Sequence, residues 1–167
     1  MDDQPLRAGS ALLPGGVAGL TAYATGLGLV VAADLLGVHP GGGIWARNLA
    51  GAEYLILHAG VHVPVWDGTV RTEVLGHTAA VLSLLVLSGA LVARPGGTSE
   101  TGGFWSGGSV AVGYFPATAI AGLAAVVLVD AVTLTQMIAP VFLAGLVCPV
   151  CFGGLGGELA VRSASGR

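Results

Sequence analysis

Residues 110–157 read VAVGYFPATAIAGLAAVVLVDAVTLTQMIAPVFLAGLVCPVCFGGLGG, and Asp130 is the single formally charged residue among them. A transmembrane helix needs about 20 mostly apolar residues, so this stretch is too long for one crossing and suits two joined by a tight turn. The polar residues 133–136, TLTQ, mark the expected turn. The stretch therefore predicts two membrane spans, at about 110–133 and 137–161.

Two further apolar runs, about 13–37 and 74–93, bring the predicted number of spans to four. Each run is followed by a cluster of glycine and proline, which breaks helical continuity. Residues 98–108 are rich in Gly, Ser and Thr and predict a loop between the second and third spans. Its Phe104 and Trp105 stand where aromatic side chains anchor a protein at the membrane interface.

The composition supports the same class of protein. The chain of 167 residues is 54% hydrophobic and 9% charged, with a mean hydropathy of +0.85, whereas about a quarter of the residues in a soluble domain are charged. The net charge is −3 and the sequence has no basic run, so we expect no nucleic-acid binding. We expect an all-α helical bundle, a single membrane domain over 1–167, in contact with the lipid bilayer of the cell membrane.

Residues 44–65 form a more ambiguous element. Arg47, Tyr54, His58 and His62 fall on one narrow stripe of a helical wheel, and most other positions are apolar. Such a helix lies in the interface, re-enters partway, or crosses as a fifth span. The arginines divide four against two between the sides under either topology, so they do not decide. We expect four spans plus an amphipathic or re-entrant helix, with both termini cytoplasmic.

A C-x-x-C motif, Cys148-Pro149-Val150-Cys151, lies within the last expected span. Two thiols at this spacing suit thiol–disulfide chemistry, which makes Cys148 and Cys151 candidate catalytic residues. With four spans and this motif in the last one, the chain resembles the vitamin K epoxide reductase family, and that resemblance implies a quinone pocket capped by the 37–73 segment. The chain departs from the family in lacking a second cysteine pair. The alternative is two small apolar side chains packed beside a proline kink.

Histidine and glutamate side chains form a second candidate site. His58 and His62 are spaced i, i+4, as are Glu73 and His77. Two helices that present such pairs can hold a metal ion through nitrogen and oxygen ligands, or a haem between two histidines. The alternative is that these side chains are solvated at the membrane interface, with Glu73 favourably placed at a helix start.

Two acids and an amide form a third candidate set, a polar path. Asp34 and Asp130 lie near the ends of the first and third expected spans, and Gln136 lies in the expected turn. Acids in spans are costly and usually face a partner or water, so these residues could line an ion or proton path. Near the outer interface the same residues would only cap helix ends.

Small residues recur at four-residue spacing within the expected spans, which allows helix backbones to approach closely. The pairs are Gly15 and Gly19, Ala22 and Gly26, Ala121 and Ala125, and Gly153 and Gly157. They predict a tight bundle, or association with a second copy or another membrane protein. The leading functional hypothesis is a non-enzymatic membrane subunit, scaffold or minor transporter. The alternative is a thiol redox protein or a metal- or haem-binding protein, with no cofactor established.

Overall fold

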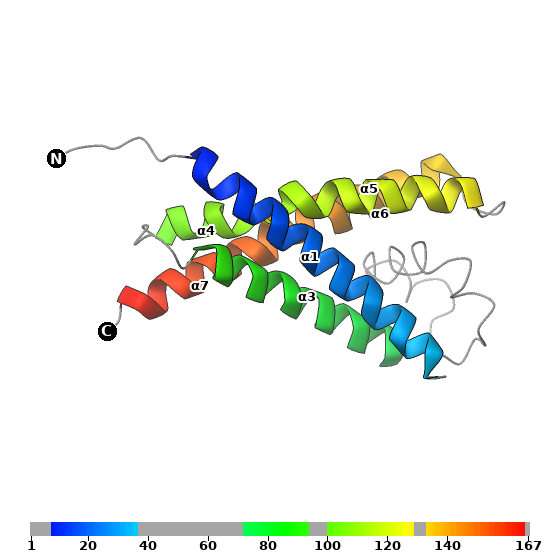
Figure 1. Cartoon of the computed structure of the whole chain (residues 1–167), viewed down its shortest axis with the longest axis horizontal. Helices are drawn as coiled ribbons and strands as arrows, with labels where there is room; N and C mark the ends of the chain where they lie inside the picture. The colour runs from blue at the N-terminus through cyan, green and yellow to red at the C-terminus, as the bar shows by residue number, and fades with distance from the viewer. Residues whose placement is uncertain (1–7, 37–71, 94–99, 129–132, 166–167) are drawn as a thin grey trace.

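The computed structural model of the chain describes residues 8–36, 72–93, 100–128 and 133–165. These ranges are helical and contain no strand, so the prediction of an all-α protein is confirmed. Figure 1 shows the helices. They are α1 (Ala8–Leu35), α3 (Thr72–Ala93), α4 (Glu100–Gly108), α5 (Ala111–Leu128), α6 (Leu134–Phe142) and α7 (Gly154–Ser165), with the π-helical segments η2 (Leu143–Val147) and η3 (Pro149–Gly153) between α6 and α7.

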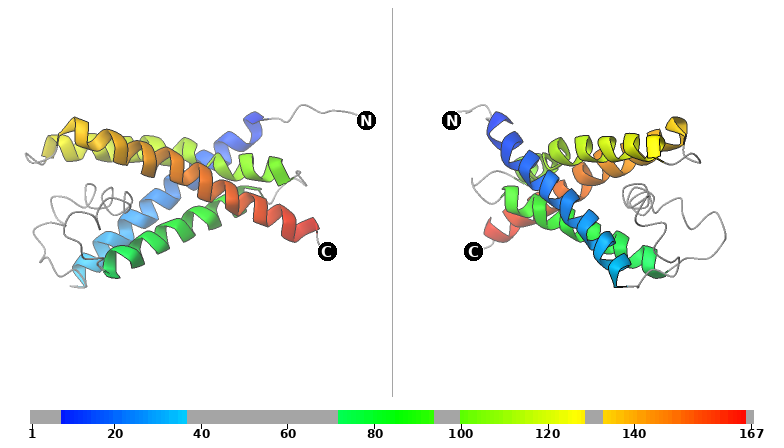
Figure 2. Two further views of the ribbon diagram at one scale, coloured as in Figure 1. Left: turned by 180° about the vertical axis from the view of Figure 1, so that it is seen from behind. Right: turned by 45° about the vertical axis from the view of Figure 1, so that its right-hand side comes forward.

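The helices form four rods, because α4 runs on into α5, and α6 runs through η2 and η3 into α7. The start of α1, the end of α3, the start of α4 and the end of α7 lie at one end of the bundle (Figure 1). Toward the opposite end the pair α1 and α3 diverges from the pair α5 and α6, as all three views show (Figures 1 and 2). The rods therefore cross near their middles.

Three helical runs are long and apolar enough to cross a membrane: Leu12–Leu29, Thr101–Ala124 and Met137–Ser165. A shorter apolar run, Ala79–Ala93, lies in α3. Large apolar side chains face outward on these rods; Leu13 and Val127 are 77% and 79% exposed. Apolar residues that face outward on every rod are what a lipid environment favours.

Two details of the expected helix boundaries are wrong. Residues 98–108 were expected as a loop, but Glu100–Gly108 is helix α4 and belongs to the same apolar run as α5. Its glycines permit close packing against another helix, and a composition rich in glycine does not distinguish this role from a turn. The expected turn at 133–136 is also misplaced, since α5 ends at Leu128 and α6 already begins at Leu134. The proposed helix at 44–65 lies outside the described residues.

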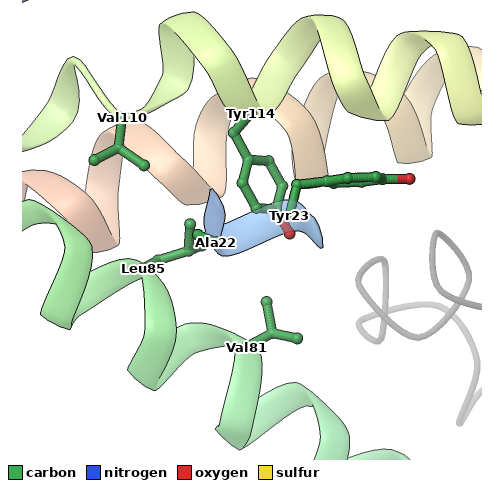
Figure 3. Close-up of a cluster of buried hydrophobic side chains, with 6 residues drawn as sticks. All are labelled: Ala22, Tyr23, Val81, Leu85, Val110 and Tyr114. Atoms are coloured by element: carbon green, nitrogen blue, oxygen red, sulfur yellow. The ribbon is translucent and has the colours of Figure 1, made fainter. Parts of the chain in front are cut away.

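The core lies where α1, α3 and α5 meet (Figure 3). The rings of Tyr23 and Tyr114 pack edge to face, with centroids 5.4 Å apart and an interplanar angle of 80°, an arrangement that aromatic pairs prefer. Around them lie the buried side chains of Ala22, Val81, Leu85 and Val110. Cys148 and Phe152 pack on this cluster from the fourth rod, so all four rods share one core.

Candidate functional site

Close contacts from two other helices converge on Gly153, at the end of η3. A Cβ atom added to Gly89 of α3 would overlap the carbonyl oxygen of Gly153, and so would one added to Gly107 of α4. On Gly153 itself, a Cβ would lie 2.7 Å from the carbonyl oxygen of Gly107. Backbones of three rods therefore touch at one point with no side chain between them. Contacts of this kind allow weak Cα–H···O hydrogen bonds in addition to dispersion.

The contact between α4 and α7 extends over two helical turns. Gly103 and Gly107 of α4 face Gly157 of α7 and Gly153 at the end of η3, so each rod contributes two glycines spaced by four residues. Beside them the Phe104 ring covers Gly154, where a Cβ would come within 2.5 Å of the ring. Trp105 contacts Phe104 edge to face and is 65% exposed. Phe104 is thus a packing residue of this crossing, and Trp105 faces outward.

A second crossing joins α1 to the junction of α4 and α5. A Cβ on Gly15 would overlap Ser109, one on Gly19 would overlap the Val110 carbonyl oxygen, and one on Gly113 would overlap that of Gly16. The predicted role of small residues in close packing is therefore confirmed for Gly15 and Gly19, as it is for Gly153 and Gly157. Sequence reasoning missed the partners on α4; Gly103 and Gly107 carry the same four-residue spacing.

The π-helical winding on either side of Cys148 has a local cause in Pro149. Proline has no N–H to donate, and its ring collides with the carbonyl four residues earlier, here that of Gly145. Widening the turn moves that carbonyl away, and the Cys148 N–H bonds instead to the Leu143 carbonyl, five residues back. Pro149 is fully buried. The proline predicted to kink the last span thus sits inside a widened helix at the centre of the bundle.

The two thiols of the C-x-x-C motif face different surroundings. Both cysteines are free; Cys148 is half-buried against the core, and Cys151 is exposed. An α-helix turns by about 100° per residue, and the wider π-helical winding turns by less. Two positions three residues apart therefore diverge more than they do on an α-helix. The redox role of the pair remains a prediction, and its geometry provides one outward-facing thiol.

The buried polar side chains among the described residues are Ser109 and Thr118. Each hydroxyl donates a hydrogen bond to its own helix, Ser109 to the Ser106 carbonyl at 2.6 Å and Thr118 to the Tyr114 carbonyl at 2.9 Å. Satisfied in this way, a hydroxyl is tolerated in an apolar interior. The hydroxyl oxygen of Tyr23 is buried as well, as is the whole side chain of Tyr114, and the other buried side chains of the described interior are apolar.

The predicted metal and path residues lie either toward the end of the bundle opposite the start of α1, or outside the residues that the structure describes. Asp34 is in the last turn of α1, Glu73 and His77 are in the first turns of α3, and those two helix ends lie at the same end of the bundle (Figure 1). Gln136 is in the first turn of α6. His58, His62 and Asp130 lie outside the described residues. Within the described ranges no group of three or more His, Cys, Asp or Glu could hold a metal ion, and both sets remain predictions.

Residues 67–164 match the model of a family of unknown function (DUF7978). The matched segment contains α3 to the end of α7 almost completely, and therefore the whole crossing at Gly153, whereas α1 precedes it. No curated protein and no solved structure matches the chain.

Proposed function

The chain belongs to this DUF7978 family, and we propose from its architecture that it is a small multi-pass membrane protein that acts as a non-enzymatic subunit or scaffold. The observation that carries the proposal is the crossing at Gly153, where three rods are in backbone contact. Backbone contact of this kind fixes the relative positions of helices, because no side chain can repack between them. A bundle fixed in this way offers a constant outer surface to lipid and to a partner.

The polarity of the interior supports a packing role more than a transport role. An ion or proton path needs polar or ionisable side chains that face the inside of the bundle. Among the described side chains, the buried polar groups are the hydroxyls of Ser109 and Thr118, which are bonded to their own helices, and the hydroxyls of the two core tyrosines. An enzyme would likewise need a concave site with converging polar groups. The described interior is instead filled by the two tyrosines and the aliphatic side chains around them.

We propose that the four rods all cross the membrane. Three of them are long and apolar enough, and α3 supplies the fourth with a shorter apolar run. The start of α1 and the end of α7 then lie on the same side (Figure 1). Arg7 directly precedes α1, Arg94 directly follows α3, and Arg162 lies in the last turn of α7. An excess of arginine marks the cytoplasmic side, so this end of the bundle faces the cytoplasm of a cell membrane.

Cysteine labelling in intact cells tests this orientation. Two single-cysteine variants, Ser163→Cys on α7 and Thr135→Cys on α6, are made in a chain that carries Cys148→Ala and Cys151→Ala. Both positions are exposed and lie at opposite ends of the bundle. A membrane-impermeant maleimide should label Thr135→Cys in intact cells and Ser163→Cys only after permeabilisation. Equal labelling of both from outside overturns the orientation, and release of the chain by alkaline carbonate overturns the membrane proposal itself.

The subunit role is tested by the protein mass of the solubilised particle. A monomer contributes 16.4 kDa. In mild detergent, light scattering corrected for detergent should give a larger protein mass, from a second copy or another membrane protein. A particle that is monomeric both in mild detergent and after cross-linking in the intact membrane rules the role out. The matched control is the same measurement after harsh detergent, which should reduce the mass to that of the monomer.

A further inference from the structure

The connection between α1 and α3 is much longer than the other connections between rods. It comprises residues 36–71, whereas residues 94–99 join α3 to α4 and residues 129–133 join α5 to α6. The family match also begins within the long connection, at residue 67, and contains nearly all of the other three rods. Along the sequence, α1 is thus set apart from a unit formed by α3 to α7.

The three rods of that unit are joined to one another by backbone contacts that do not involve α1. Gly153 meets Gly89 of α3 and Gly107 of α4, and a Cβ on Gly156 of α7 would overlap the carbonyl oxygen of Val86 on α3. Contacts as close as these fix the relative positions of helices. Removal of α1 would therefore leave them in place.

Helix α1 lies on one side of this unit, against the middle of α3 and the start of α5 (Figure 3). The surface that it contacts, called the α1-binding surface below, is formed by Val81 and Leu85 of α3, by Val110, and by Gly113 and Tyr114 of α5. The side chains of Leu85, Val110 and Tyr114 are completely buried. The surface is therefore closely packed when α1 is in place.

The side of α1 that faces this surface carries Gly15, Gly19 and Tyr23, each four residues after the one before. A Cβ on Gly15 would overlap Ser109, and one on Gly19 would overlap the carbonyl oxygen of Val110, so the two backbones touch. Tyr23 follows one turn later and packs edge to face on Tyr114. The surface thus fits a helix with the pattern G-x3-G-x3-Y that starts from the same end of the bundle as α4 (Figure 1).

The opposite side of α1 faces outward. Leu13, Val17 and Ala24 are exposed on it, and a Cβ added to Gly28 would have nothing within 4 Å. A helix that is packed on one side and exposed on the other can move sideways into lipid without displacing another rod. Helix α1 is therefore positioned to leave and to rebind.

We propose that α1 is an exchangeable transmembrane helix, which the α1-binding surface holds by packing and not through the connection to α3. The surface accepts a helix with the G-x3-G-x3-Y pattern from a separate chain as it accepts its own. In the intact chain the connection keeps α1 at an effective concentration on the order of millimolar, which disfavours replacement. The inference goes beyond the proposed subunit role and does not depend on it.

Cleavage of the full chain between α1 and α3 tests whether the contact needs the connection. A protease recognition sequence is inserted between Gly42 and Gly43, and the protein, tagged at its C-terminus, is purified in mild detergent and cut. We expect the N-terminal fragment, which contains α1, to stay with the tagged fragment during affinity purification. Release of the N-terminal fragment in mild detergent overturns the proposal.

Exchange tests whether the surface accepts the helix from outside. The probe is a fluorescent synthetic peptide of residues 8–36, added in excess to the cut protein. All substitutions are made in the peptide, so the fold of the protein is the same in every sample. The parent peptide should replace the bound fragment and then purify with the tagged fragment. Uncut protein should take up about tenfold less peptide, because its own α1 remains tethered.

Two peptide variants show whether the contact seen in the structure is responsible. Gly19→Val places a side chain against the Val110 carbonyl and should bind about tenfold more weakly than the parent peptide. Gly28→Val is the matched control, because its added atoms meet no neighbour, and it should bind like the parent peptide. Absence of uptake of the parent peptide, equal uptake by cut and uncut protein, or equal binding of the two variants overturns the proposal.

Discussion

Gly89 and Gly153 approach so closely that a Cβ atom on Gly89 would overlap the carbonyl oxygen of Gly153. The obstacle is backbone, which cannot rotate away as a flexible side chain can. Two segments that lie far apart in the sequence, α3 and the end of η3, are thereby held at a distance that only glycine permits.

Substituting Gly89 with valine should destabilise the fold. The added side chain has to displace the backbone of η3, and overpacking of this kind costs about 1–3 kcal/mol, occasionally more. Gly28→Val is the matched control, because Gly28 lies in α1 with nothing within 4 Å of its added Cβ. Unfolding of the purified protein by a denaturing detergent, followed by circular dichroism, measures both. Equal stability of the two variants would contradict the close approach.

The contact between Phe104 and Gly154 provides a double-mutant test. Gly154→Ala places a methyl group 2.5 Å from the Phe104 ring, so this variant alone should lose stability. Phe104→Ala removes the ring. This change costs about 3–5 kcal/mol in a fully buried core, and it should cost less here because Phe104 is only partly buried. In the double variant the clash is absent, so its loss of stability should be smaller than the sum of the two single losses, by a coupling energy of about 0.5–3 kcal/mol. Strictly additive losses would show that Phe104 does not cover Gly154.

The hydroxyl of Thr118 should contribute little to stability. It donates to the carbonyl of Tyr114 on its own helix, and even the hydrogen bonds that join two helices in membrane proteins are worth only about 0.6 kcal/mol on average. Thr118→Val keeps the branched shape that packs against Gly145, so its unfolding free energy should stay within about 1 kcal/mol of the parent. Thr118→Leu changes that shape and should be clearly less stable. A large loss for valine would instead assign the hydroxyl a partner beyond its own helix.

The two cysteines should differ in reactivity toward a membrane-permeant maleimide. Cys151 faces outward and Cys148 packs on the core, so Cys148→Ala should retain fast labelling and Cys151→Ala should label slowly. In the parent chain, which carries both cysteines, pre-treatment with a reductant should leave the labelling unchanged if the thiols are free, as they are in this structure. An increase in labelling after reduction would show an oxidised pair and would support the redox alternative.

Hydrophobic runs were sufficient to locate most of the helices. The expected spans at 13–37, 74–93 and 137–161 coincide closely with α1, α3 and the run Met137–Ser165, because length and apolar character alone decide which segments can cross a bilayer. Helix α4 was missed because Gly103 and Gly107 have the composition of a loop. Their packing role is visible only in the structure, where they contact Gly153 and Gly157. Contact between segments that are distant in sequence does not affect local helix propensity, so the sequence alone does not reveal it.

The candidate site was less predictable than the fold. The four-residue spacing of Gly153 and Gly157 predicted a close contact but not its partner. Pro149 predicted a kink, whereas the amount of widening depends on the helices packed around it. The residues expected to bind a metal were chosen by their spacing alone. The contacts that the structure describes do not test that choice.

The convergence of three rods on Gly153 also has a consequence for the order in which the protein assembles. During synthesis α3 and α4 emerge well before η3, and until then neither Gly89 nor Gly107 has the surface against which it packs. The contact of α3 and α4 at Gly153 therefore cannot form until the last rod is inserted. We expect the bundle to close in a late, concerted step, and a ribosome stalled before Gly153 to hold a chain that proteases still cut readily.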